Sequence, residues 1–294
     1  MKKYFYGHYF KLQSKDNTIA LIPSYSKYNN EYKSSLQIIT SNESYLISYK
    51  YDEYEKYKGF EVKIGSNIFN KDGIILNIDR DDLKVEGKIE FKEFKKLNSN
   101  IMGPFKFIPF MECVHEVVSI KHRVNGYIKI NGINYEFNDD SYGYIEGDKG
   151  RSFPSVYIWT HANLKSGSIM LSVADIPFGL FHFTGLIGFI YHDNKIIRLG
   201  TYYFARALKI SDNEVIIKQG KYKLFIKLIK RNEFPLKAPI VGKMDRIIKE
   251  SAECIVEYKL LKNDIIIFQE VVNNASMEYE YTKNKEFNKL DKKK

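Results

Sequence analysis

The chain has 294 residues, of which 44% are hydrophobic and 28% are charged. These proportions are typical of folded globular proteins and exclude wholesale disorder. The formal net charge is +10, and residues 283–294 hold six lysines against two acids, so we expect a disordered basic tail. The excess that remains is spread over the body of the chain and is typical of a solvated basic surface. We therefore expect no nucleic-acid partner; a basic nucleic-acid binder, with salt-sensitive affinity, is the alternative.

Alternating apolar and polar residues predict short β-strands nearly throughout the chain. In chain order the strand candidates are residues 9–12, 19–23, 74–78, 83–91, 127–130, 133–137, 157–160, 169–173, 215–217, 224–229 and 265–268. Asn131-Gly132 supplies the positive φ angles of a two-residue hairpin turn. One short helix is predicted over residues 241–253, after Pro239, because Met244, Ile247, Ile248 and Ala252 share a helical face.

The chain contains an internal repeat with an offset of about 140 to 150 residues. Residues 73–91 correspond to residues 214–230, and Cys113 corresponds to Cys254. The repeat predicts an all-β protein of two closed or nearly closed antiparallel barrels. We place the domains at residues 1–140 and 141–282, followed by the tail at 283–294. The two cysteines are expected to be small core residues, one in each barrel.

The N-terminal residues do not resemble an export signal, because Lys2 and Lys3 lead into aromatic and polar residues rather than an apolar segment. The longest apolar run, residues 176–191, is interrupted by His182 and Thr184 and is too short to span a membrane. Two cysteines do not make a disulfide framework. We expect a cytoplasmic protein.

The segment at residues 144–159 reads YIEGDKGRSFPSVYIW. It resembles the signature of tocopherol cyclase-like proteins, in which an acidic turn runs through Gly and Phe-Pro into an aromatic strand that ends in Trp. Residues 7–10 (GHYF) are similar to the family's Gly-Trp-Tyr-Phe, and residues 235–239 (PLKAP) are similar to its Pro-Leu-Arg-Ala-Pro. The chain departs from the family at His8, which replaces a Trp, and at residues 148–150, where Asp-Lys-Gly replaces Asn-Trp-Gly.

This resemblance implies two tandem lipocalin-like barrels that act on a hydrophobic small molecule without a cofactor. The enzymes that name the family convert a prenylated hydroquinone into a chromanol, and related proteins hydrate or protonate prenyl alkenes. Such an isomerase-type cyclisation, or a hydration, needs a positioned acid, a base and an aromatic pocket that shields a cation. The alternative is a lipocalin-like carrier that binds an apolar ligand without chemistry.

Glu146 and Asp148 are the candidate acid and base, because they lie two residues apart in a glycine-bounded turn. His161 is expected to assist them, and Tyr144 and Arg151 are expected to contact substrate. The alternative is that both acids pair with neighbouring basic residues in a structural domain junction.

Tyr157, Trp159, His161 and Asn163 alternate along one predicted strand and therefore share a face. Hydrogen-bonding groups on aromatic rings favour a face that lines the substrate; the alternative is a face that meets the other domain. His115 shares a predicted strand face with Cys113 and Val117 and is either a substrate contact or a core histidine. The histidines lack metal-ligand spacing, so no metal site is predicted.

Residues 176–183 form an aromatic-rich segment that is either barrel core or a lid that touches lipid. Lysines of the tail would add about 1 kcal/mol each near an anionic membrane, so peripheral membrane contact is a further hypothesis. The oligomeric state has no signature in the sequence.

Overall fold

The computed structural model describes residues 3–108, 111–178, 181–211, 213–240 and 243–280. It is all-β and forms two nearly closed antiparallel barrels, as the repeat predicted. Unit 1 consists of residues 1–100, 109–153 and 236–247, and unit 2 of residues 101–108, 154–235 and 248–294. The predicted tail at 283–294 lies outside the described residues. Among the residues that are described, no helix is long and apolar enough to cross a membrane.

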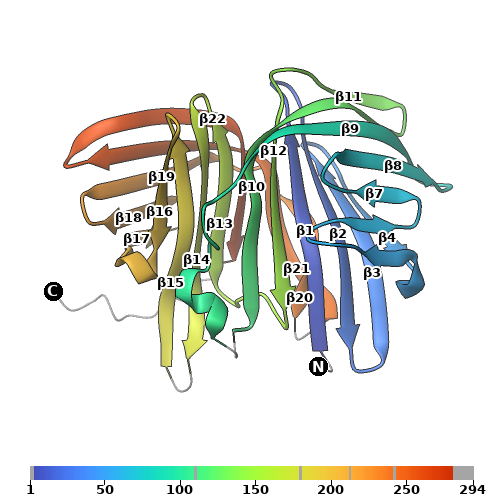
Figure 1. Cartoon of the computed structure of the whole chain (residues 1–294), viewed down its shortest axis with the longest axis horizontal. Coiled ribbons are helices and arrows are strands. Elements are labelled where there is room, and N and C mark those ends of the chain that lie inside the picture. The colour runs from blue at the N-terminus through green and yellow to red at the C-terminus, as the bar shows by residue number, and fades with distance from the viewer. Residues whose placement is uncertain (1–2, 109–110, 179–180, 212, 241–242, 281–294) are drawn as a thin grey trace. The chain divides into compact units, whose positions relative to one another are not determined.

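Unit 1 is built on a 12-stranded sheet whose strands follow the order β4-β3-β2-β1-β12-β10-β9-β8-β7-β6-β5, with β11 paired to β10 (Figure 1). Its strands are β1 (Lys3–Gln13), β2 (Thr18–Tyr28), β3 (Glu31–Thr40), β4 (Ser44–Tyr49), β5 (Tyr54–Lys56), β6 (Val62–Ile64), β7 (Asn67–Phe69), β8 (Gly73–Asp79), β9 (Lys84–Lys95), β10 (Cys113–Ile130), β11 (Ile133–Phe137) and β12 (Tyr142–Gly150).

Unit 2 repeats this topology in the order β16-β15-β14-β13-β22-β21-β19-β18-β17, with β20 paired to β21. Its sheet contains β13 (Tyr157–Leu164), β14 (Gly167–Phe178), β15 (Phe181–His192), β16 (Lys195–Gly200), β17 (Arg206–Ser211), β18 (Glu214–Gln219), β19 (Tyr222–Lys230), β20 (Phe234–Ile240), β21 (Lys243–Lys262) and β22 (Ile265–Glu280), of which residues 236–247 in β20 and β21 group with unit 1. Strands β13, β22 and β21 therefore hold the places that β1, β12 and β10 hold in unit 1. Within the described residues, short 3₁₀ segments lie at Tyr51–Glu53, Gly103–Phe107 and Thr201–Tyr203.

The Asn131-Gly132 turn joins β10 to β11 as predicted, with Ile130 paired to Ile133. Both turn residues have positive φ angles, 48° and 87°. Such angles match the twist of the flanking strands, which fixes the register of the hairpin.

Each unit has its own hydrophobic core, made by alternate residues of its strands. The core of unit 1 includes Phe10, Leu12, Leu21, Leu36, Ile38, Phe69, Ile89 and Ile145. The core of unit 2 includes Ile158, Ala162, Leu171, Ile190, Ile217, Ile226, Val256 and Leu260. Strand β13 is buried along its whole length, so the face of this strand that points away from the core is covered as well.

The predicted helix at residues 241–253 is wrong: Lys243 onward belongs to the long strand β21, and Val241 lies outside the described residues. A spacing of four residues fits both a helical turn and a strand face, so Ile248 and Ala252 did not distinguish the two. Ile247 distinguishes the strand from the helix, because its side chain is 62% exposed while that of its neighbour Ile248 is fully buried. From Ala252 through Leu260, every second residue is buried.

Unit 1 extends past the predicted domain boundary at residue 140. Strand β12 hydrogen-bonds to β1 and β10, so residues 141–153 belong to unit 1 rather than opening the second barrel. The segment 176–183 forms the paired ends of β14 and β15, with Ile176 opposite Phe183, and its residues 179 and 180 lie outside the described part of the chain.

Ile248→Ala is expected to lower the free energy of unfolding by about 2–4 kcal/mol, because it removes a fully buried side chain. Ile247→Ala, the matched control on the exposed face, is expected to change it by less than about 0.5 kcal/mol. Urea denaturation of the two variants measures the difference. Equal losses would contradict the strand and favour the helix.

Candidate functional site

The central three strands of unit 1 place side chains from distant parts of the sequence on one face. Strand β12 runs between β1 and β10, and its residues pair with both neighbours (Figure 1). Asp148 pairs with Gly7 on one side and with His115 on the other. Paired residues of an antiparallel ladder share a face, so Glu146, Asp148 and His115 lie together. Ile145, one residue out of phase, points into the core of unit 1.

His115 lies between the two carboxylates. Its Nδ1 is 3.0 Å from Asp148 Oδ1, and its Nε2 is 3.2 Å from Glu146 Oε2. The side chains of His115, Glu146 and Asp148 are 10%, 7% and 21% exposed, so Asp148 is the member most open to its surroundings. We refer to these three residues as the His115 cluster.

Two further groups contact the His115 cluster. The Tyr144 hydroxyl donates a hydrogen bond of 2.5 Å to Glu146 Oε2. The Cys113 thiol donates to Asp148 Oδ1 at 3.2 Å. Cys113 was expected in the barrel core, and that prediction is wrong: it lies on the face of Asp148, whereas Cys254 does belong to the core of unit 2.

The charges of the cluster govern its protonation. Burial disfavours the charged imidazole, but Asp148 and Glu146 outweigh burial and raise the pKa of His115 well above its usual value. Burial, together with the same carboxylates, raises the pKa of the Cys113 thiol and of the Tyr144 hydroxyl well above their usual values. Both therefore remain neutral hydrogen-bond donors at neutral pH, while His115 holds a proton between two acceptors.

One nitrogen or oxygen from each cluster residue lies within 4.8 Å of the others, which raises the question of a metal ion. The two carboxylates, however, approach opposite nitrogens of the same ring. A metal-bound histidine offers one nitrogen to the ion and uses the other for an outer partner. All three residues could bind one ion only if the His115 ring turned, so the arrangement fits a shared proton better than a metal centre.

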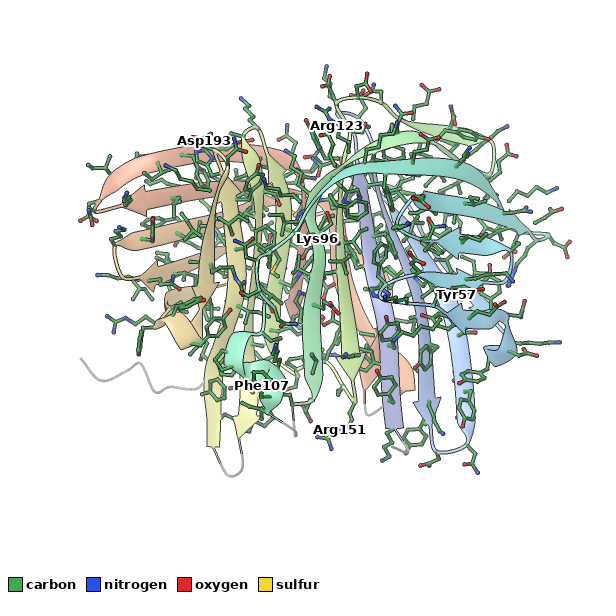
Figure 2. The ribbon with its side chains drawn as sticks, in the orientation of Figure 1. Tyr57, Lys96, Phe107, Arg123, Arg151 and Asp193 are labelled. Carbon is green, nitrogen blue, oxygen red and sulfur yellow. The ribbon has the colours of Figure 1, made fainter. Side chains whose placement is uncertain are left out.

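The remaining predicted residues lie in unit 2 or on the surface. Tyr157, Trp159, His161 and Asn163 share one buried face of β13, as predicted, opposite the core residues Ile158 and Ala162. Arg151 is exposed just beyond the end of β12, and its side chain projects from the ribbon in Figure 2. The structure thus groups Glu146 and Asp148 with His115 and Tyr144, and it places His161 in the other unit.

Unit 2 also has a buried acid on the central strand that corresponds to β12. Glu146 pairs with Tyr9 across β12 and β1, and Glu278 pairs with Trp159 across β22 and β13. The Tyr157 hydroxyl donates to Glu278 Oε2 at 2.5 Å, and both side chains are buried. Sequence analysis missed Glu278, because an offset of about 140 to 150 residues maps Glu146 beyond the end of the last strand.

Two pockets are described in unit 1, with volumes of about 360 and 630 Å³. The first is lined by residues of β7, β8 and β9, and the second by residues of β9, β10 and β11. Neither includes a residue of the His115 cluster, so these two hollows and the cluster are separate features.

The architecture defines a class: proteins built from two tandem antiparallel barrels. Crystal structures of this class match nearly the whole chain, although no family model and no curated protein sequence matches it. CghA with Sch210972 superposes with a TM-score of 0.58 at 8% identity, covering 96% of this chain and 90% of CghA. Kievitone hydratase from Nectria haematococca gives 0.55 at 10% identity, with coverage of 94% and 88%. An AttH-like protein from Nitrosomonas europaea gives 0.55 at 9% identity, with coverage of 96% and 93%.

The raised pKa of His115 predicts how stability depends on pH. The folded state binds this proton more tightly than the unfolded chain, whose histidine titrates near about 6.5. The stabilisation is therefore fully present below about pH 6.5 and is lost as pH rises through the higher folded-state value. We expect His115→Asn to flatten the fall in unfolding free energy above about pH 6.5, measured by urea denaturation across pH. His182→Asn, at a half-exposed histidine, is the control; an unchanged slope in His115→Asn would contradict the assignment.

Proposed function

We propose that the chain is an enzyme that protonates an alkene of an apolar, prenylated phenolic substrate and thereby cyclises or hydrates it. The observation that carries the proposal is the His115 cluster: an imidazole between two carboxylates, buried in unit 1. This arrangement stores a proton next to two groups that can deliver or receive it.

The reaction needs one proton delivered and one proton recovered. Asp148, the most exposed member of the cluster, is the group placed to face substrate, and His115 supplies it with a proton at 3.0 Å. The O–H bond of the Asp148 carboxyl breaks as the alkene electron pair forms a new C–H bond and leaves a tertiary cation. A lone pair of the substrate's phenol oxygen then forms the C–O bond of the ring.

The ring oxygen next loses its proton to the cluster, which returns to its starting state. Glu146, 3.2 Å from the other nitrogen of His115, is the second acceptor in this relay. Cyclisation leaves the molecular formula unchanged, and attack by water in place of the phenol gives the hydrated product. Tyr144 orients Glu146 through its 2.5 Å hydrogen bond, so we assign it a positioning role.

The comparisons support this class of chemistry without fixing the substrate. Kievitone hydratase is named for a hydration, and the CghA crystal contains the small molecule Sch210972. The finer proposal, a tocopherol cyclase-like activity, rests on the sequence resemblance at residues 144–159. The proposed chemistry uses unit 1 groups alone; substrate contacts by Tyr157, Trp159, His161 and Asn163 remain a prediction.

A geranylated methylhydroquinone incubated with the protein in D₂O tests the proposal. Cyclisation by protonation places one deuterium at the former alkene carbon, and hydration adds the elements of water as well, so mass spectrometry distinguishes the two. We expect Asp148→Asn and Glu146→Gln to lower the rate of deuterium incorporation by about 10²- to 10⁴-fold. Tyr144→Phe is expected to lower it less, by about tenfold, because it removes one hydrogen bond to Glu146.

Glu136→Gln, on the exposed strand β11, is the matched control and should keep the wild-type rate. Turnover that survives both acid substitutions in the folded protein would overturn the assignment of the cluster. Tight binding of the probe with no deuterium in the recovered molecule would favour the carrier instead. An organic extract of the protein purified from its own host, analysed by the same mass spectrometry, identifies the natural ligand class.

A further inference from the structure

A second polar group of residues lies in unit 1, on the face of β1 that points toward the core. Tyr6 and His8 precede the core residues Phe10 and Leu12 on the same face of this strand. Tyr54 from β5 and Phe60 pack against the same core. Neighbouring rings are close: Tyr6 and His8 have centroids 4.9 Å apart, and Tyr25 and Tyr54 have centroids 5.0 Å apart. We call Tyr6, His8, Tyr25, Tyr54 and Phe60 the Tyr54 cluster.

The hydrogen bonds of Tyr6 determine what His8 can offer. The Tyr6 hydroxyl has a single proton and donates it to the Gly59 carbonyl at 3.1 Å. The 3.3 Å contact between this hydroxyl and His8 Nε2 therefore requires the ring nitrogen to be the donor. Burial lowers the pKa of His8 to about 3, so the ring is neutral at physiological pH. Its Nδ1 is then an acceptor, and His8 is only 3% exposed.

His8 Nδ1 has no hydrogen-bond partner among the described residues. The Tyr54 hydroxyl is buried and also lacks a partner there. Burial, with Tyr6, Tyr25 and Tyr4 nearby, raises the pKa of Tyr54, so this hydroxyl remains a neutral donor. An unsatisfied buried polar group costs about 1–3 kcal/mol of stability. His8 Nδ1 and the Tyr54 hydroxyl, both near Tyr6, are therefore groups that a bound molecule could satisfy.

A single hydroxyl group can complement the acceptor His8 Nδ1 and the donor Tyr54, since a hydroxyl both donates and accepts a hydrogen bond. The rings around them suit a flat apolar body. We propose that the Tyr54 cluster is a ligand site for a neutral hydroxylated aromatic molecule, whose hydroxyl donates to His8 Nδ1 and accepts from Tyr54. The Lys56 ammonium, 3.6 Å from the centre of the Tyr6 ring, lies on an exposed residue at the outer edge of the cluster.

This site and the His115 cluster are on opposite faces of the same strands. His8 pairs with Gly147, whereas Asp148 and Glu146 flank that glycine and point to the other face. Gly147 leaves room for the His8 ring, because a Cβ there would lie 2.7 Å from His8 Cδ2. The proposal therefore stands independently of the proposed reaction.

The test uses two fluorescent probes of the same shape, 2-naphthol and naphthalene, titrated into the full chain. We expect 2-naphthol to bind about tenfold or more tightly than naphthalene, because only it carries the hydroxyl. Tyr54→Phe should weaken 2-naphthol binding by about 3- to 10-fold and leave naphthalene binding unchanged. The same variant should be no less stable than wild type without ligand, because it removes an unpartnered hydroxyl.

His8→Phe, which keeps an aromatic ring, is the second variant and should weaken 2-naphthol binding in the same way. Tyr203→Phe, at an exposed tyrosine of unit 2, should leave both affinities unchanged. Equal affinity for the two probes, or full 2-naphthol affinity in Tyr54→Phe, would overturn the site. Loss of stability in Tyr54→Phe without loss of affinity would assign the two polar atoms to bound water and would also overturn it.

Discussion

The pairing register between β10 and β12 decides which side chains of unit 1 can react with one another. His115 lies opposite Asp148, and the strand period of two places Glu146 on the same face. A slip of one residue would move His115 to the core side and leave both carboxylates without their shared partner. The register of this pairing shifts after Val117 and again after Ser119. Residues 113–117, which include His115, therefore pair with β12 in a register different from that of the rest of β10.

A buried charge is stable only when its neighbours compensate for it. His115 meets this requirement with a carboxylate on each ring nitrogen, and Tyr144 supplies a hydrogen bond to one of them. On the core face of the same sheet, burial has the opposite result: among the described residues His8 has no carboxylate in contact with its ring, and burial lowers its pKa so that the ring stays neutral. One layer of backbone thus separates an imidazole that holds a proton from one that does not.

Local patterns in the sequence were sufficient for the eleven predicted strand segments and the Asn131-Gly132 turn, because each depends on residues close together in the chain. They did not indicate strands such as β3 and β16. The helix at 241–253 failed because a four-residue spacing fits two periods. The candidate acids were found from one segment, residues 144–159. Their contact with His115 could not be predicted, because it depends on a strand pairing between residues 33 positions apart, which no local pattern encodes. The two unpartnered atoms of His8 and Tyr54 depend likewise on packing between strands.

The duplicated topology gives the site of unit 1 a partial counterpart in the second sheet. Glu278 on β22, like Glu146 on the equivalent strand β12, accepts a hydrogen bond of 2.5 Å from a tyrosine, but β21 contains no histidine. In the second sheet, which follows the same strand order, the strand equivalent to β10 therefore supplies no imidazole. A carboxyl group held by a tyrosine is compatible with either repeat, whereas the paired imidazole distinguishes one copy from the other. The two halves therefore offer a comparison within one chain between a tyrosine-bound carboxyl group whose neighbouring strand carries a histidine and one whose neighbouring strand does not.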